Sequence, residues 1–133
     1  MQRRQLLEGL LAGLVLLAPA SAEARCAPPQ LPNEVRASRY VFEGVIESVT
    51  ATEATLRVVA AWKGTPPAQL RVAVNPRVSL ARATPGQTFL VLAQGDSDAT
   101  LTVARCGATG MMSAALATRL GALHLQRRVA PSR

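Results

Sequence analysis

The first 24 residues decide how much of this chain is left to fold. Arg3 and Arg4 precede an apolar run from Leu6 to Leu17, and small residues follow at positions 20–22. A basic start, an apolar middle and a small-residue exit are typical of an export signal. The apolar run has about 12 residues, whereas a membrane-spanning helix needs about 20. We therefore expect a cleaved signal peptide over residues 1–22, with residue 24 as the alternative end, and a periplasmic or secreted mature protein.

The expected signal peptide leaves two questions open, its export route and its cleavage. The arginine pair resembles a twin-arginine export signal, but such pairs also occur in ordinary signals, so the export route stays open. An uncleaved membrane anchor is the alternative to processing.

The composition of the mature chain favours one small domain and argues against nucleic acid as a partner. Removing the signal leaves roughly 110 residues, the size of a single domain. The whole chain has 15 Lys and Arg against 8 Asp and Glu, a net charge of +7, but only one Trp, one Tyr and two Phe. Nucleic-acid binders concentrate basic residues in a stripe with aromatics between them, and these arginines are dispersed. Dispersed charge predicts solubility, or weak contact with an anionic envelope surface.

Cys26 and Cys106 are the two cysteines of the chain. In an oxidising compartment a lone pair of this kind predicts one disulfide. Closing a loop of about 80 residues stabilises a fold by roughly 4 kcal/mol in the chain-entropy model. The sequence holds no CxxC motif, so a structural bond is expected rather than a redox-active pair.

The mature sequence alternates short apolar segments with turn residues. A short helix is expected over 34–39, with Asn33 as its N-cap. Five strands follow from the alternation of apolar side chains, and a tight turn from Pro85 and Gly86. In the second strand we expect Leu56, Val58, Ala60 and Trp62 on one face. The expected strands are 40–50, 55–63, 69–74, 88–93 and 100–106, the fourth of them covered on both faces because it is almost continuously apolar.

The longest helical pattern covers residues 111–128. Four apolar residues fall three or four positions apart and form one stripe: Met112, Leu116, Leu120 and Leu123. Ser113 is the expected cap, and Arg127 and Arg128 suit the negative end of the helix. We expect this stripe to pack on the strands, with a partner-binding face as the alternative, and residues 129–133 to form a frayed tail.

Several pieces of the mature chain, in this order, resemble a known family: residues 26–29 (CAPP), 40–46 (YVFEGVI), 59–64 (VAAWKG), 85–93 (PGQTFLVLA) and Cys106. They are similar to bacterial proteins related to the tissue inhibitors of metalloproteinases, in the netrin-like group of oligonucleotide/oligosaccharide-binding (OB) barrels. The resemblance implies an all-β fold with flanking helices, a five-stranded Greek-key OB-like barrel over residues 23–110 plus the C-terminal helix. It also implies a bond from Cys26 to Cys106. Its motif residues are Phe42, Gly44, Trp62, Lys63, Gly64, Gly86 and Phe89.

The inhibitory chemistry of that family does not carry over. The animal inhibitors chelate the protease's zinc through a mature amino-terminal cysteine in a Cys-x-Cys start, which fills the open position of the metal. Here the expected cleavage leaves residues ahead of Cys26, and no second cysteine lies two positions away. We therefore transfer no inhibitory residue.

Catalytic groups are scarce. The single histidine, His124, has no recognisable partner, and the acids do not follow calcium-loop spacing, although a weak cation site at Asp96 and Asp98 is an alternative to a solvated turn. We expect no catalytic or metal-ligating residue and no cofactor. The sequence predicts an exported, non-enzymatic domain that binds an unidentified protein. A structural envelope protein, attracted to anionic surfaces by its arginines, is the alternative.

Overall fold

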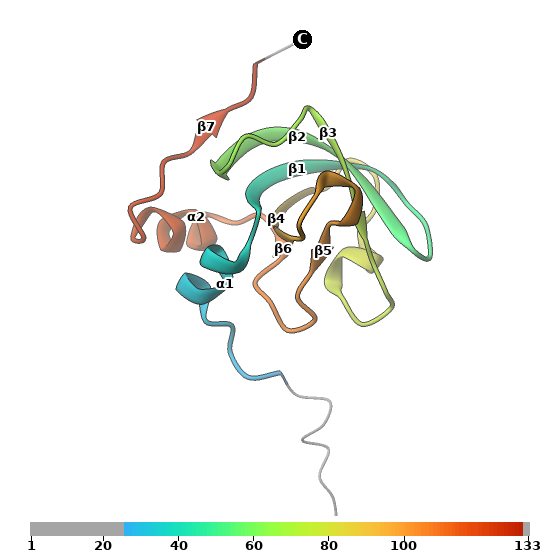
Figure 1. The fold of residues 1–133 in the computed structure, drawn as a ribbon, viewed down its shortest axis with the longest axis horizontal. Helices are drawn as coiled ribbons and strands as arrows, with labels where there is room; N and C mark the ends of the chain where they lie inside the picture. Colours follow the sequence, from blue (N-terminus) through green and yellow to red (C-terminus); the bar gives the residue numbers. More distant parts are fainter. Residues whose placement is uncertain (1–25, 132–133) are drawn as a thin grey trace, which may run out of the picture.

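The computed structural model describes residues 26–131, so the expected signal peptide lies outside the described residues. The described residues form seven strands, two α-helices and two short 3-10 helices, labelled η (Figure 1). In chain order these are α1 (Leu31–Ala37), β1 (Tyr40–Val49), β2 (Glu53–Lys63), β3 (Gln69–Ala73), η4 (Ser79–Arg82), β4 (Thr88–Gln94), η5 (Asp98–Thr100), β5 (Thr102–Val103), β6 (Gly110–Met111), α2 (Ala114–Gly121) and β7 (Arg128–Val129).

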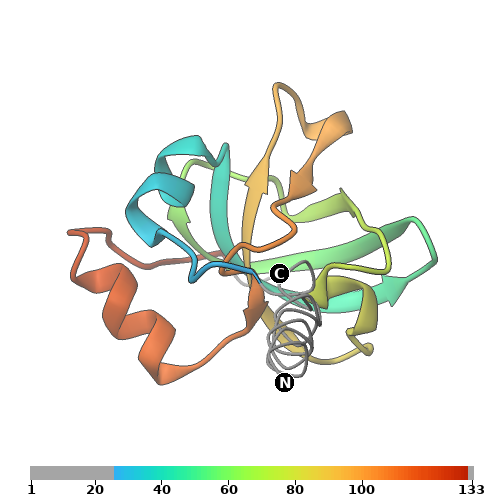
Figure 2. The same ribbon diagram turned by 90° about the horizontal axis from the view of Figure 1, so that it is seen from below.

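Five strands close into a barrel. β1 pairs antiparallel with both β2 and β4, and β2 pairs antiparallel with β3. β5 completes the ring, because it pairs parallel with β3 and antiparallel with β4. The order β1-β2-β3-β5-β4 and back to β1 is that of a Greek-key OB-like barrel, as the sequence predicted (Figures 1 and 2).

The barrel interior is filled by the inward side chains of the alternating strands. Phe42 and Ile46 of β1 meet Leu56 of β2, Val72 of β3 and Val91 of β4, all at most 1 % exposed. Successive side chains of a strand point to opposite faces, so each strand contributes every second residue to this core. In β1 the residues that point into the barrel are Tyr40, Phe42 and Ile46.

A second apolar cluster lies on the outside of the barrel, beneath the two helices. Leu90 and Leu92 of β4 pack there with Val35 of α1 and Leu120 of α2. Both helices lie on the same side of the barrel (Figure 1). β4 is thus covered on both faces, as its continuous apolar sequence indicated, and the C-terminal helix packs on the barrel as expected.

The expected face of Trp62 is wrong. Register shifts in the β1–β2 pairing place Glu43 opposite Ala60 but Gly44 opposite Val58, and Val41 opposite Lys63 but Phe42 opposite Ala61. These two shifts leave Val59 and then Trp62 as extra residues of β2, and the extra Val59 reverses the faces of the residues that follow it. Trp62 therefore lies in the outer cluster, whereas Leu56 and Val58 point into the barrel.

The expected helix over 111–128 is too long. α2 covers only Ala114–Gly121, with Ser113 as its cap: the Ser113 hydroxyl accepts a hydrogen bond from the amide of Leu116 at 3.2 Å. His124, with a φ of 62°, has the left-handed conformation that does not continue a helix. Arg128 and Val129 form β7 against β2, so Val129 does not belong to a frayed tail.

Three smaller corrections concern element ends. α1 begins at Leu31, so Asn33 lies inside the helix and Gln30 takes the cap position. The expected strand 100–106 is only the two-residue β5, preceded by η5. Gly110 and Met111 form β6, a strand that was not expected, since Met111 was expected to begin the C-terminal helix. None of the described helices is long and apolar enough to cross a membrane.

Candidate functional site

The predicted disulfide is present. Cys26 and Cys106 are bonded, with their Cα atoms 5.3 Å apart and 80 positions apart in the sequence. The bond fixes the extended segment before α1 to the loop between β5 and β6.

Glu43 is a buried carboxylate on the outer face of β1, and the sequence analysis did not single it out as a site. Trp62 donates its indole N–H to Glu43 Oε2 at 2.9 Å. Arg127 binds both carboxylate oxygens, at 2.6 and 3.0 Å. Burial would raise the pKa of Glu43, but the hydrogen bonds from Arg127 and Trp62 and the charge of Arg127 lower it below its usual value. Glu43 therefore holds the C-terminal segment against the barrel as an anion.

Lys63 places its positive charge at the C-terminal end of α1. Its ammonium group donates to the carbonyl oxygens of Val35 at 2.8 Å, Arg36 at 3.2 Å and Ser38 at 2.5 Å. The last carbonyls of a helix have no partner within the helix and carry the negative end of its dipole. A single flexible ammonium binds two of them, from Val35 and Arg36, together with the carbonyl of the C-cap residue Ser38, which explains why a lysine stands at this position.

The other residues on which the sequence resemblance depends have structural roles. Phe42 and Phe89 lie in the barrel core, and Gly44 packs beside Phe42 and Leu56. Gly64 has a φ of +76°, and a Cβ there would lie 2.7 Å from the ring of Tyr40. Gly86 has a φ of +91° in the exposed turn before β4. These residues therefore lie in or beside the barrel core and at two positions of positive φ, and they do not gather into one site.

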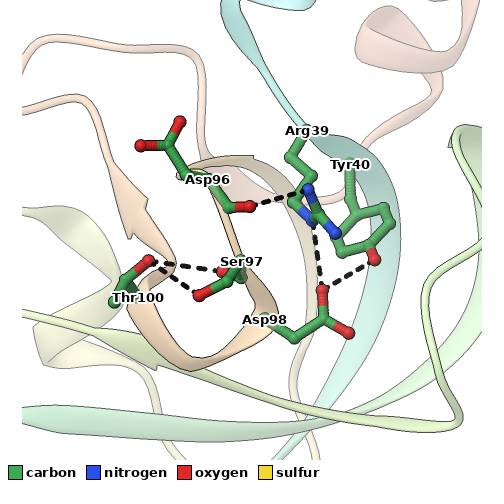
Figure 3. Close-up of polar contacts among 6 residues, drawn as sticks. All are labelled: Arg39, Tyr40, Asp96, Ser97, Asp98 and Thr100. Carbon is green, nitrogen blue, oxygen red and sulfur yellow. Dashed lines mark hydrogen bonds and ion pairs between the residues drawn. The ribbon is translucent and has the colours of Figure 1, made fainter.

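A polar cluster ties the β4–β5 turn to the start of β1 (Figure 3). Asp98 Oδ1 accepts from the Tyr40 hydroxyl at 2.7 Å and from Arg39 Nε at 3.1 Å, while a second Arg39 nitrogen donates to the carbonyl oxygen of Asp96, also at 3.1 Å. The Tyr40 hydrogen bond, together with Arg39, lowers the pKa of Asp98. This carboxylate is therefore already engaged by a cation and a phenol, which argues against the cation site considered at Asp96 and Asp98.

A hollow of about 910 Å³ lies where the C-terminal segment runs along β2. We call it the edge hollow. Val59 and Arg57 of β2 line one side, and Val129, Ala130 and Pro131 line the other. Its remaining walls are Glu47, Val58, Pro66, Ala68 and Gln69. Val129 is 71 % exposed, so an apolar side chain stands at the rim of the hollow.

A second hollow, about 360 Å³, lies beside the disulfide and is lined by three exposed arginines, Arg77, Arg82 and Arg105. We call it the arginine hollow. Pro28 and Pro29 form part of its wall. In the sequence these arginines are dispersed, and their positions along the chain do not reveal that the fold brings them together.

No group of three or more His, Cys, Asp or Glu that could hold a metal ion occurs within residues 26–131. His124 is exposed in the segment after α2. Comparison with family models, with curated proteins and with solved structures finds no match to this chain. The resemblance to the inhibitor-related barrels therefore remains a prediction drawn from the residues alone.

Proposed function

We propose that this chain is an exported, non-enzymatic domain that binds another protein, and that it binds an extended segment of that partner at the edge hollow. The observation that carries this proposal is the way the chain covers the edge of β2. Ala60 and Ala61 pair with the two residues of β7, and the amide of Ala130 donates to the Val59 carbonyl at 2.9 Å. An extended segment of this same chain thus already adds a strand at that edge.

The hollow beside this edge has the chemistry of a peptide site. Main-chain pairing at a sheet edge supplies affinity, and adjacent hollows select alternate side chains of the added strand. The walls combine apolar groups such as Val59 and Pro66 with a cation, Arg57, and a hydrogen-bonded acid, since Gln69 donates to Glu47 at 2.8 Å. β7 pairs only with β2 among the described residues, so its other edge is open to a further strand.

Photo-crosslinking tests this proposal. A photoreactive amino acid replaces Arg57, which faces the edge hollow, in the exported protein. The matched control carries the same group at Ala115, an exposed residue of α2. We expect illumination of producing cells to give a discrete protein adduct from position 57 and none from position 115.

The adduct is then identified, and a synthetic peptide from its crosslinked segment is titrated against the purified chain. Binding that Val129→Lys weakens and that survives roughly 0.5 M salt supports the proposal, because a packed interface is little affected by screening. Equal labelling at positions 57 and 115, or a peptide that does not bind, contradicts it.

The alternative function is a structural envelope protein held to anionic surfaces. The exposed arginines without a close acidic partner favour it: Arg57, Arg77, Arg82, Arg105 and Arg119 form no ion pair among the described residues. Retention by such attraction fades steeply between low and moderate salt, whereas retention by a protein interface does not. Stepwise salt washing of isolated envelopes distinguishes the two.

A further inference from the structure

We infer that the arginine hollow is a binding site for a phosphate monoester group. It is independent of the proposed protein-binding role, because the arginine hollow and the edge hollow share no lining residue. The site would take an anion of two charges, carried either by a soluble molecule or by a lipid headgroup.

The first argument is the convergence of unpaired cations. Arg77 follows β3, Arg82 ends η4, and Arg105 lies between β5 and β6, yet all three line one hollow. Their side chains form no ion pair and no hydrogen bond with any residue of the described range 26–131. Three like charges at one place repel one another unless an anion joins them, so the arrangement is complementary to a multiply charged anion.

The second argument is that the frame around these arginines is fixed. The amide of Arg77 donates to Asn75 Oδ1 at 2.9 Å. Leu80, in the same short helix as Arg82, is completely buried in the barrel core, and the Ser79 hydroxyl donates to the Thr109 carbonyl at 2.8 Å. Arg105 precedes the disulfide-bonded Cys106. The three backbone positions are therefore set before any ligand arrives, which reduces the entropy lost on binding.

The third argument is the match of chemistry and size. A guanidinium presents its N–H groups in a planar fork that matches phosphate oxygens, and it stays charged at any physiological pH. A volume of about 360 Å³ accommodates a phosphate with part of its ester substituent, at the small end of ligand sites. Pro28 and Pro29 offer that substituent an apolar wall. The carboxyl group of Glu34 does not line the arginine hollow; it lies against Gly107 and accepts a hydrogen bond from the amide of Ala108 at 2.8 Å.

The test compares two variants of equal charge. One carries Arg77→Gln, Arg82→Gln and Arg105→Gln, and the matched control carries Arg57→Gln, Arg71→Gln and Arg119→Gln, at exposed positions outside the arginine hollow. Phenyl phosphate is titrated into each purified chain by calorimetry. We expect the first variant to lose about tenfold or more in affinity and the control to change less than about twofold, because only the first loses bidentate contacts.

A second arm identifies the source of the phosphate. Flotation is measured with phosphatidylcholine vesicles that contain either phosphatidic acid, a monoester, or phosphatidylglycerol, a diester. A preference for phosphatidic acid that the first variant loses supports the site with a lipid headgroup as its ligand. Binding of phenyl phosphate without vesicle binding supports the site with a soluble ligand. Equal losses in the two variants, or no binding of either probe, overturn the inference.

Discussion

Trp62, Lys63 and Gly64 are consecutive, and each has a different task. Trp62 fills the outer cluster and donates to Glu43, Lys63 binds the carbonyls that end α1, and Gly64 turns the chain beside Tyr40. An aromatic ring, a flexible cation and a residue without a side chain are needed in that order. The short motif noticed in the sequence is therefore explained by local structure and requires no ligand.

Removing the Lys63 ammonium should weaken the attachment of α1. In Lys63→Met the apolar stem remains, but three carbonyls lose the ammonium, and only that of Val35 keeps another donor, the Ser38 amide. Hydrogen bonds to a charged group contribute about 1.5–3 kcal/mol. We expect the free energy of unfolding to fall by about 2 kcal/mol in urea denaturation. Arg71→Met, at an exposed and loosely paired position, is the control and should change it by less than about 0.5 kcal/mol. Equal effects of the two substitutions would contradict this role of Lys63.

Glu34 is buried with one oxygen unpaired, and this gives a pH-dependent prediction. Oε1 accepts from the amide of Ala108, whereas Oε2 has no partner among the described residues. Burial raises the pKa of Glu34 above its usual 4.5, although the Ala108 hydrogen bond lowers it in part. The folded state therefore binds this proton more tightly than the unfolded state. The stabilisation it provides is complete below about pH 4.5 and is lost as the pH rises through the raised pKa.

Glu34→Gln keeps the acceptor for Ala108 and cannot ionise. We expect it to be more stable than the parent chain by about 1 kcal/mol at pH 7, with the advantage shrinking toward pH 4. Urea denaturation at both values measures the difference. A gain of the same size at pH 4 and pH 7 would show that ionisation of Glu34 is not the cause.

At the scale of elements, the alternation of apolar residues predicts the long strands well and the short strands poorly. β1 to β4 each carry five or more residues of alternating or continuous apolar sequence, and their positions were predicted within a few residues. β5, β6 and β7 have two residues each and exist because distant segments pair with them. The alternation over 100–106 indicated a strand much longer than β5, and the two residues of β6 or of β7 are too few to show a periodicity.

The C-terminal helix shows the same limit. Leu123 continues the apolar spacing of α2 and packs on the outer cluster, although it lies beyond the end of the helix at Gly121. Apolar spacing reports which residues are buried, and an irregular segment can bury them as well as a helix does. The positive φ of His124 and the ion pair between Arg127 and Glu43 depend on the tertiary structure, so the spacing of apolar residues does not predict them.

The attachment of β7 should depend on the ion pair between Arg127 and Glu43. Arg127→Met leaves a buried carboxylate without its cation, which costs about 3–5 kcal/mol for a fully buried pair. The Arg127 side chain is 43 % exposed, so we expect a smaller loss of about 2 kcal/mol near neutral pH. Amide exchange of Ala130, which bonds Val59 beside β7, should also accelerate.

The pH dependence identifies this pair as the cause. Because the pKa of Glu43 is lowered in the folded chain, its contribution is present above the ordinary value near 4.5 and is lost as the pH falls through the lowered value. The difference between parent and Arg127→Met should therefore shrink in acid. The exposed control Arg119→Met should show neither the loss nor the faster exchange of Ala130, and an effect equal to that of Arg127→Met would exclude the ion pair as the cause.

At the scale of the whole molecule, the arginine hollow is formed by segments that lie far apart in the sequence. The arginine hollow takes residues from the segment before α1, from η4 and from the loops around it and around Cys106, positions 26 to 109 of the chain. A sequence without structure shows such arginines as scattered. Barrel closure and the disulfide bring them to one place, which is why the fold was predictable from the residues and these surfaces were not.

The disulfide should therefore matter for both stability and binding. In a variant with Cys26→Ser and Cys106→Ser we expect unfolding in urea to require about 4 kcal/mol less, because the bond closes a loop of about 80 residues in the unfolded chain. The barrel should still fold, since its five strands pair independently of residues 26–30. Arg105 and the two prolines then lose their fixed positions, so affinity for phenyl phosphate should fall severalfold even under conditions where the variant is fully folded. A folded variant that binds the probe as well as the parent chain would show that the bond stabilises the domain without organising the arginine hollow.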